Sequence, residues 1–297
     1  MIANYITIGT YNAGLIELKL FGKTVFTFAP HVIQRSLALP DFLKNSGCDV
    51  ICLQEVFDRS HAEYLKSELM SVYPHQYFPR TYRPKIFDTG LAFLSKYPLQ
   101  NTGVKFFSDQ LLEEKLFAPK GYITARLTAP HFGAVSIVNC HTTAGGSKHH
   151  PESSISDSCR QKQLTELAKV SKVSSKYGDV AMIVGDLNCG PEASYDNFNA
   201  LINKGYSDTV ANWYSGKELA PVTWDPNNPL NVNSPHKTSP AQRIDHILIA
   251  NSSPKIDAID VKKIGADATI EVNSSAMITV SDHYGFVVTF SRVACDI

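Results

Sequence analysis

The segment VAMIVGDLN, residues 180–188, is an apolar run that ends abruptly in polar residues. Its first five residues, 180–184, predict a buried strand. The glycine, aspartate and asparagine that follow are typical of a polar turn. A side chain at a strand end is also held rigidly at the edge of a sheet, where it can face a cleft. Asp186 and Asn188 are therefore candidate functional residues.

Polar residues recur beside the other predicted strands. The strands expected at 5–11, 49–53 and 134–139 are followed by Asn12, Glu55 and His141, and those at 243–250 and 284–290 begin near Asp245, His246, Asp282 and His283. Singly, each has an ordinary interpretation: a turn residue, a helix-start charge, an edge histidine, a loop ion pair, or a partner for Arg243. Together, these carboxylates, histidines and asparagines indicate a metal and phosphate site.

The remaining patterns favour a layered fold. Helices are expected at 30–45, 60–70, 158–171 and 193–203, and further strands at 90–95 and 122–127. Several adjacent strands are joined by short turns, which favours antiparallel pairing. We therefore expect a sheet-rich α/β fold of two packed sheets with helices outside. We prefer one catalytic domain over residues 1–297 to two small ones. The loop 221–242, rich in Pro, Asn and Ser, is expected to be functional or disordered.

Composition narrows the function classes. Hydrophobic residues make up 43% of the 297 residues and charged residues 19%, which suits a soluble globular fold. Lys plus Arg total 28, as do Asp plus Glu, and a formal net charge of zero argues against a protein that coats nucleic acid non-specifically. A local basic patch remains compatible with this balance.

The cysteines and the start of the chain bear on the cellular compartment of the protein. The six cysteines lack a C-x-x-C pair, and several lie in apolar runs, so we favour reduced, buried thiols over disulfides. The start of the chain lacks a basic signal-peptide region, and no run of about 18 apolar residues predicts a membrane span. We expect a soluble protein, cytoplasmic or secreted, and likewise a monomer.

The residue types at the strand ends suit phosphate-ester chemistry. A hard cation such as Mg²⁺, or alternatively Mn²⁺ or Ca²⁺, takes oxygen ligands and keeps several waters, so one or two carboxylates suffice. Histidine beside an acid can move a proton or donate to a phosphoryl oxygen. Asparagine amides can hold a water or stabilise charge. The chain contains no competing H-E-x-x-H, P-loop or G-x-S-x-G pattern.

The motifs in their order resemble the endonuclease/exonuclease/phosphatase superfamily, also described as the DNase I-like fold. The matching pieces cover nearly the whole chain and are the segments 10–12, 51–56, 90–95, 139–142, 185–188, 243–247 and 281–284. The resemblance implies a four-layered α/β sandwich and a metal-dependent hydrolase that attacks a phosphoester with activated water.

The resemblance also implies roles for the strand-end residues. Glu55 is the expected main metal ligand with Asn12 beside it, and Asp282 an outer or alternative ligand. Asp186 would orient or deprotonate the attacking water, and Asn188 would hold water or phosphate. His141 would donate to a phosphoryl oxygen, and His283, polarised by Asp245, would be the base or would stabilise the transition state. The sequence does not decide between Asp186 and His283 as the proton acceptor.

Two departures from the family pattern point away from DNA repair. DNA-repair members often carry an acid two residues after the first asparagine, and this chain has Gly14 there. Glu55 also follows Asn12 by 43 residues, a longer gap than in compact nucleases.

Other segments are similar to the neutral sphingomyelinase branch. These are 223–230, 117–122 and the group Arg160, Gln163 and Leu164, and they imply Lys120, Tyr122, Arg160 and Trp224 as substrate-binding residues. The insert 14–28 is either an apolar lip for a lipid surface or a hairpin packed on the core. Trp213 and Tyr214 are a second candidate lip, and the loop 143–157, with Lys148, His149 and His150, a candidate border of the headgroup pocket. The favoured reaction is hydrolysis of a choline-type phosphodiester, with a phospholipid substrate and peripheral membrane contact.

Three alternatives remain. A DNase-like endonuclease would need a basic face. An inositol-phosphate or phosphoinositide phosphatase would need clustered cations, for which Arg80, Arg83, Lys85 and Lys120 are candidates. A binding protein on an inactive scaffold would not need the retained acids and histidines.

Overall fold

Two six-stranded sheets form the centre of the computed structural model, which describes residues 4–20, 23–80, 88–145, 150–234, 236–272 and 276–292. The first sheet has the order β13 (Ile256–Ile264), β16 (Gly285–Arg292), β1 (Tyr5–Asn12), β4 (Val50–Gln54), β6 (Ala92–Ser95) and β5 (His75–Tyr77). The second has the order β11 (Tyr206–Asp208), β12 (Asp245–Ala250), β10 (Val180–Asp186), β9 (Gly133–His141), β8 (Gly121–Ala129) and β7 (Gln100–Phe106). Both sheets mix parallel and antiparallel pairs.

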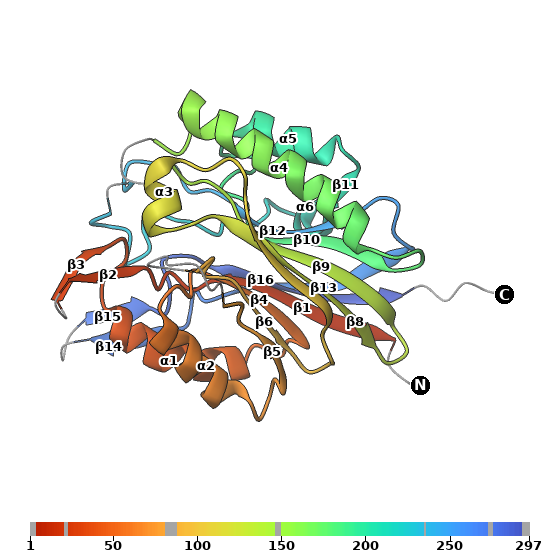
Figure 1. The fold of residues 1–297 in the computed structure, drawn as a ribbon, viewed down its shortest axis with the longest axis horizontal. Coiled ribbons are helices and arrows are strands. Elements are labelled where there is room, and N and C mark those ends of the chain that lie inside the picture. Colours follow the sequence, from red (N-terminus) through yellow and green to blue (C-terminus); the bar gives the residue numbers. More distant parts are fainter. Residues whose placement is uncertain are drawn as a thin grey trace.

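Helices cover the outer face of each sheet (Figure 1). The helices α1 (Val32–Lys44) and α2 (Arg59–Leu69) lie on the first sheet, and α4 (Ser154–Ser174) and α5 (Tyr195–Ile202) lie on the second. Side-chain caps fix two of these starts, because Asp58 accepts the N–H of Ser60 and Ser153 accepts that of Ser156. The result confirms the predicted four-layered α/β sandwich.

The run at 180–184 shows why two buried layers are needed. Val180, Met182 and Val184 point into the core between the two sheets, where they join Ile8 and Phe286 from the first sheet. The intervening residues of β10 point the other way, against α4. A strand covered on both faces carries continuous apolar residues instead of an alternating pattern, so the unbroken run indicates a central strand.

Two hairpins project from the end of the sandwich opposite the two termini (Figure 1). They are β2 (Glu17–Leu20) with β3 (Lys23–Thr27), and β14 (Thr269–Val272) with β15 (Ala276–Thr279). The insert 14–28 therefore forms a hairpin, but within its described residues only the base is packed, so the structure does not decide between a packed hairpin and a lip. Its base packs through Ile16 on Phe57, whereas Val25 remains 55% exposed. Phe21 lies outside the described residues.

The predicted helices and strands are confirmed with shifts of a few residues at their ends, whereas several short elements were not predicted. Among the latter are α3 (Leu112–Phe117) and α6 (Thr209–Tyr214). The loop 221–242 carries no helix or strand in its described part, as expected, but it is closely packed. Asn228 and Asn231 are buried and donate to the backbone oxygens of Ser281 and Asp282. These hydrogen bonds hold the loop 221–242 against the segment that carries Asp282.

Cysteines and helices agree with the sequence-based expectations where the structure describes them. Cys48, Cys52, Cys140, Cys159 and Cys189 are free and buried, and Cys295 lies outside the described residues. Within the described ranges, no helix combines the length and the apolar character that crossing a bilayer requires.

Candidate active site

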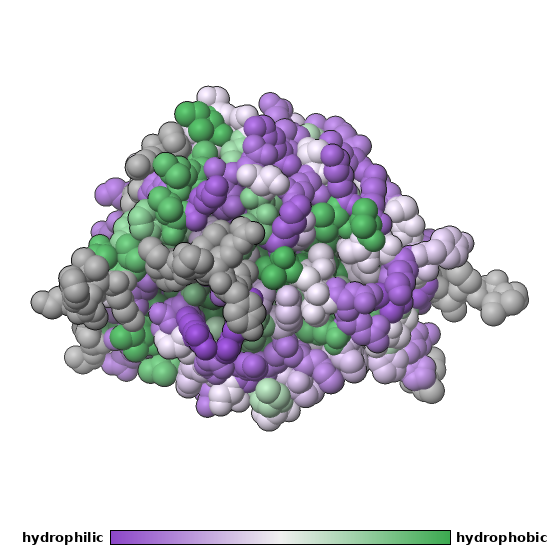
Figure 2. Space-filling view, in the orientation of Figure 1, coloured by the Kyte–Doolittle hydropathy of each residue, from purple (hydrophilic) through white to green (hydrophobic). Residues whose placement is uncertain are grey.

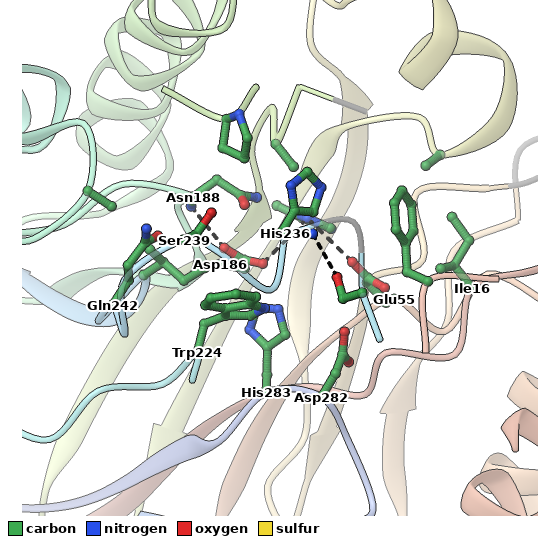
Figure 3. A pocket seen from close by; sticks show the side chains of 18 of the residues that line it. Ile16, Glu55, Asp186, Asn188, Trp224, His236, Ser239, Gln242, Asp282 and His283 are labelled. Atoms are coloured by element: carbon green, nitrogen blue, oxygen red, sulfur yellow. Dashed lines mark hydrogen bonds and ion pairs between the residues drawn. The ribbon is translucent and has the colours of Figure 1, made fainter. Parts of the chain in front are cut away.

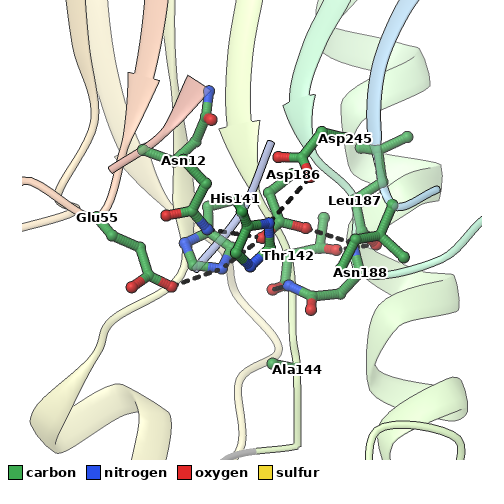
Figure 4. Close-up of polar contacts among 12 residues, drawn as sticks. Asn12, Glu55, His141, Thr142, Ala144, Asp186, Leu187, Asn188 and Asp245 are labelled. Carbon is green, nitrogen blue, oxygen red and sulfur yellow. Dashed lines mark hydrogen bonds and ion pairs between the residues drawn. The ribbon is translucent and has the colours of Figure 1, made fainter. Parts of the chain in front are cut away.

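Strand register brings the predicted residues to one end of both sheets. In the second sheet, Asp186 pairs with His141 of the parallel strand β9 and with Asp245 of the antiparallel strand β12. In the first sheet, Asn12 ends β1 opposite Gln54 of β4, one residue before Glu55. Because the sheets pack face to face, both sets of strand ends open into the same space (Figure 4).

Buried amides join the two sheets beneath this space. The Asn12 Nδ2 donates to Asp186 Oδ2 at 2.9 Å. One layer deeper, Gln54 Nε2 donates to Asn139 Oδ1 at 2.8 Å, and Asn139 Nδ2 donates to the backbone oxygen of Leu53 at 3.0 Å. Hydrogen bonds between buried groups in a low dielectric are costly to break. They therefore fix the distance between the two sets of strand ends.

Two site residues have left-handed backbones. Glu55 has φ 59° and Asn188 φ 46°. This backbone region costs non-glycine residues about 1–3 kcal/mol, so they adopt it only where the surroundings enforce it. Asn188 is held by its N–H, which donates to Asp186 Oδ1 at 2.8 Å, and by its Nδ2, which donates to the Thr142 oxygen at 2.9 Å. The left-handed backbone at these two strand ends directs both side chains toward the cleft.

His283 and Asp245 form a buried dyad across the sheets. The His283 Nδ1 lies 3.0 Å from Asp245 Oδ2. Burial alone would lower the pKa of His283, but the carboxylates of Asp245, Asp186 and Asp282, with Asp245 contributing most, together raise that pKa to about 10. The other carboxylate oxygen, Asp245 Oδ1, is buried without a hydrogen-bond partner among the described residues. The raised pKa favours the imidazolium form of His283, whose ring lines the pocket (Figure 3).

Lys120 and His141 make a second buried pair, with 2.6 Å between Lys120 Nζ and His141 Nε2. Burial and then the Lys120 charge lower the pKa of His141 well below its usual value. His141 is thus neutral, and its contacts of 3.8 Å with Glu55 and 3.5 Å with Asp186 are not ion pairs, although their geometry alone would suggest it.

The site holds more buried negative charge than its own cations balance. Burial raises the pKa of Glu55 to about 7, with Lys120 opposing and Asp282 adding to the shift. Burial, reinforced by Asp245, raises the pKa of Asp186 to about 6. A divalent cation would remove this cost, and the donors are the oxygen atoms that Mg²⁺ prefers. The residues therefore fit a hard metal ion.

Geometry distinguishes two places for a cation. Ligand atoms of Asp186, Asp245 and His283 lie within 4.8 Å of one another. Since Asp245 already holds His283 Nδ1, we interpret this group chiefly as an acid–base cluster. Glu55 and Asp282 line the opposite side of the pocket. Asn12 Oδ1 accepts the Gly14 N–H at 3.0 Å, so its predicted role as a ligand would share that oxygen.

Gly14 is in close contact with the same side. Its φ is +58°, and a Cβ added there would collide with Asp282 Oδ1. The carboxylate of Asp282 therefore occupies the space beside position 14, where an acid is absent from this chain. Ser281 fixes that loop, since its hydroxyl donates to the Asn12 backbone oxygen at 2.6 Å.

The pocket around these groups has two different walls (Figure 3). Ile16, Phe28 and Ala118 form an apolar wall beside Glu55, and Trp224, Ser239 and Gln242 form the wall beside Asp186. His236 lies between them and stacks on Phe28 with 6.4 Å between ring centroids. Glu114, His236 and Gln242 were not predicted, because no motif or spacing marks them in the sequence.

Of the four predicted substrate-binding residues, Lys120 and Trp224 line the pocket, but Tyr122 and Arg160 do not. Tyr122 lies on the outer face of β8 and donates to Glu166 at 3.2 Å. Arg160 is buried, and its guanidinium donates to Asp157, Asn197 and the Thr143 oxygen. We correct the prediction of substrate contact for both: Arg160 instead anchors the loop that borders the pocket.

Other candidates are also displaced. Trp213 and Tyr214 pack on the core between the sheets, so they are not a second lip at the pocket. Arg80 is exposed and paired with Glu63. In the loop 143–157, Ala144 and Pro151 do border the pocket. Arg83, Lys85, Lys148 and His149 lie outside the described residues.

Comparison with known proteins supports the resemblance. The model of the Endonuclease/Exonuclease/phosphatase family matches residues 9–283. Sphingomyelin phosphodiesterase 2 of Homo sapiens is 26% identical over 192 residues, which cover 60% of this chain and 42% of that protein. Sphingomyelinase C of Listeria ivanovii is 27% identical over 259 residues, 82% of this chain and 73% of that protein. The chain thus spans less than half the length of the human relative.

Solved structures share the fold at low sequence identity. SmcL has a TM-score of 0.74 at 18% identity, and a Staphylococcus aureus beta toxin mutant with bound magnesium ions has 0.73 at 17%; each match covers 97% of this chain and 99% of the other. The TDP2 of D. rerio complexed with a single-strand DNA product has 0.69 at 20%, with the same coverage. With the family match spanning nearly all of the chain, this protein belongs to the Endonuclease/Exonuclease/phosphatase family.

Proposed function

We propose that this chain is a divalent-metal-dependent phosphodiesterase that cleaves a sphingomyelin-like phospholipid on the headgroup side and releases phosphocholine. The observation that carries the proposal is the convergence of Glu55, Asp186 and His283 in one pocket, with Asp245 paired to His283 behind it. The sphingomyelinase relatives supply the substrate class. Mg²⁺ is the proposed ion, and a bound magnesium is named for the beta toxin structure.

Glu55 and Asp282 would hold the metal, with the Asn12 amide oxygen beside them. When bound, the cation neutralises phosphate charge and favours departure of the ester oxygen. Lys120 lies between this side and His141, where its ammonium can bind a non-bridging phosphoryl oxygen. In the structure His141 Nε2 accepts from the Lys120 ammonium, so the predicted donation from His141 to a phosphoryl oxygen requires Lys120 to turn from the ring to the phosphate.

Asp186 is the favoured acceptor of the proton from the attacking water. Its two carboxylate oxygens are oriented by Asn188 and Asn12. Asn188 lies at the same strand end and can hold that water. The protonated His283 is better suited to stabilise negative charge in the transition state than to take a proton, since Asp245 favours its cationic form.

The surface around the pocket suits a lipid substrate. The apolar wall beside Glu55 continues outward to α3, where Leu112 is 71% and Leu116 51% exposed, and the hairpin adds Val25 at 55%. Figure 2 shows hydrophobic side chains gathered around α3 and the start of α4. Leu112 and Leu116, with Val25, are the proposed peripheral membrane contact, because exposed apolar side chains gain free energy by entering a lipid interface.

The headgroup side argues against a highly phosphorylated substrate. Among the described residues, Lys120 is the one lysine or arginine that lines the pocket. An inositol polyphosphate needs several cations, and Arg80 is paired with Glu63 away from the pocket. The zero net charge likewise gives no general field for DNA. A DNase-like activity is the alternative that the shared fold leaves for experiment.

The decisive experiment is a substrate panel with added Mg²⁺ or Mn²⁺. Sphingomyelin and phosphatidylcholine vesicles, phosphoinositides, abasic DNA and plasmid DNA should be incubated with the parent protein and with Glu55→Gln. We expect phosphocholine from sphingomyelin with the parent protein only. Cleavage of DNA or of phosphoinositides without phosphocholine release would replace the proposed substrate class.

A further inference from the structure

Arg35 of α1 is a completely buried cation that stands behind the active site without lining its pocket. All five of its guanidinium N–H groups are used, and every acceptor is a backbone carbonyl oxygen. The bonds run from Nε to Pro30 at 2.9 Å, from Nη1 to Ala13 at 3.1 Å and Val280 at 3.4 Å, and from Nη2 to Gly14 at 2.7 Å and Ala29 at 2.9 Å.

These acceptors come from three separate segments of chain. Ala13 and Gly14 directly follow Asn12, and Val280 comes two residues before Asp282. Ala29 and Pro30 close the base of the β2–β3 hairpin. One planar guanidinium therefore sets the relative positions of two loops that carry site residues and of the hairpin. The donors of a guanidinium have a fixed geometry, so these three parts have little freedom to move against one another.

Further contacts link the position of the 13–14 segment to the carboxylate of Asp282. Gly14 abuts Asp282 Oδ1, and the Ser281 hydroxyl bonds the Asn12 backbone oxygen while lying 3.3 Å from the same Asp282 oxygen. A displacement of the 13–14 segment would therefore move Asp282. Electrostatics acts along the same line: burial lowers the pKa of Arg35, and Asp282, Tyr11 and Glu55 oppose that shift.

We propose that Arg35 is a positioning residue that holds Asn12 and Asp282 in place for a divalent cation and couples that side of the pocket to the base of the β2–β3 hairpin. The proposal rests on the proposed function for the role of the cation. It also gives the long gap between Asn12 and Glu55 a role, since α1 within that gap supplies the guanidinium and the base of the hairpin is one of the three parts that it joins.

The test compares Arg35→Lys with a matched control, Arg292→Lys. A lysine keeps the charge at position 35 but has three donors on one nitrogen and cannot reach all three segments. Arg292 also donates to backbone oxygens, those of Phe132 and Gly178, at the far end of β16. We expect Arg35→Lys to weaken Mn²⁺ binding, followed by electron paramagnetic resonance, about 10- to 100-fold. The control should bind as the parent does, and unchanged binding by folded Arg35→Lys would overturn the proposal.

Hydrogen–deuterium exchange of the parent protein keeps the proposal falsifiable if Arg35→Lys does not fold. Added Mn²⁺ should slow exchange in peptides that cover 13–14, the hairpin base at 28–31, and 280–283 together. Protection confined to 280–283 would show that the hairpin base is not coupled. Glu55→Gln separates the two proposals: if it binds Mn²⁺ like the parent protein, the metal site itself is wrong, whatever Arg35 does.

Discussion

The acid–base side and the cation side of the pocket differ in how fully protein groups alone balance their charges and hydrogen bonds. On the acid–base side, Asp186 is hydrogen-bonded by Asn12 and Asn188, and Asp245 is paired with His283. On the cation side, Glu55 has a raised pKa and lies 3.8 Å from a neutral histidine, and the Asp282 carboxylate is contacted by the Ser281 hydroxyl at 3.3 Å and lies against Gly14. The acid–base side is prebuilt, whereas the cation side requires a charge from outside. The two sides should therefore fail in different ways.

The largest expected effect separates the two sides directly. His283→Ala should lower turnover about 10²- to 10⁴-fold, because it removes the cationic partner of the reacting phosphate, while Mn²⁺ affinity stays near that of the parent protein. Glu55→Gln should lose turnover together with Mn²⁺ affinity. Steady-state kinetics and Mn²⁺ titrations of both variants check this. Equal loss of metal affinity in the two variants would erase the distinction.

A smaller effect is expected within the acid–base side. Asp245→Asn removes the carboxylate that contributes most to the raised pKa of His283, so that pKa falls from about 10. The imidazolium would lose its proton at lower pH, so the alkaline limb of the profile of kcat against pH should shift to lower pH values. Turnover near neutrality should fall about 100-fold. Profiles of kcat against pH for the parent protein and the variant test this. An unmoved limb would mean that another group controls it.

The raised pKa values on both sides of the pocket predict a pH-dependent stability in metal-free protein. With pKa values of about 7 and about 6, Glu55 and Asp186 keep protons that the unfolded chain releases near pH 4. The folded state then binds more protons, so the free energy of unfolding falls as pH rises from about 4 to 7. His283, with a pKa of about 10, contributes a further fall from about pH 6.5 upward.

Thermal denaturation with and without Mg²⁺ checks this sign. The ion binds ionised carboxylates, so it should raise Tm more at about pH 8 than at about pH 5. Protein treated with a chelator is the control. A Tm increase that is the same at both pH values would show that the carboxylates are already ionised without metal.

The smallest effect lies outside both sides. Leu112→Ser with Leu116→Ser should reduce hydrolysis of vesicle sphingomyelin about tenfold through lost apolar contact, and should leave hydrolysis of a water-soluble choline phosphodiester unchanged. Val173→Ser is the matched control, since Val173 is 85% exposed but lies at the end of α4, whereas the pocket residues Pro151 and Glu152 precede the start of that helix. Equal loss on both substrates would indicate damage to the fold.

The sequence revealed the strand-end residues because motifs and strand patterns coincide there, as in Asp186 after a continuous apolar run. Tyr122 shows where this reasoning failed. Ile123 points into the core between the sheets, so its neighbour Tyr122 must point outward, a consequence of strand alternation that the motif match ignored. Arg35 could not be found, because its partners are backbone oxygens of three distant segments and leave no residue pattern.

Gly14 carries a consequence for redesign. With φ +58° and Asp282 Oδ1 in the place of a Cβ, a larger residue at this position would strain the backbone and displace the Asp282 carboxylate. An engineer who wished to install an acidic side chain there could not do so by a single exchange. Positions 14 and 282 would have to be redesigned together, because both side chains would occupy the same space.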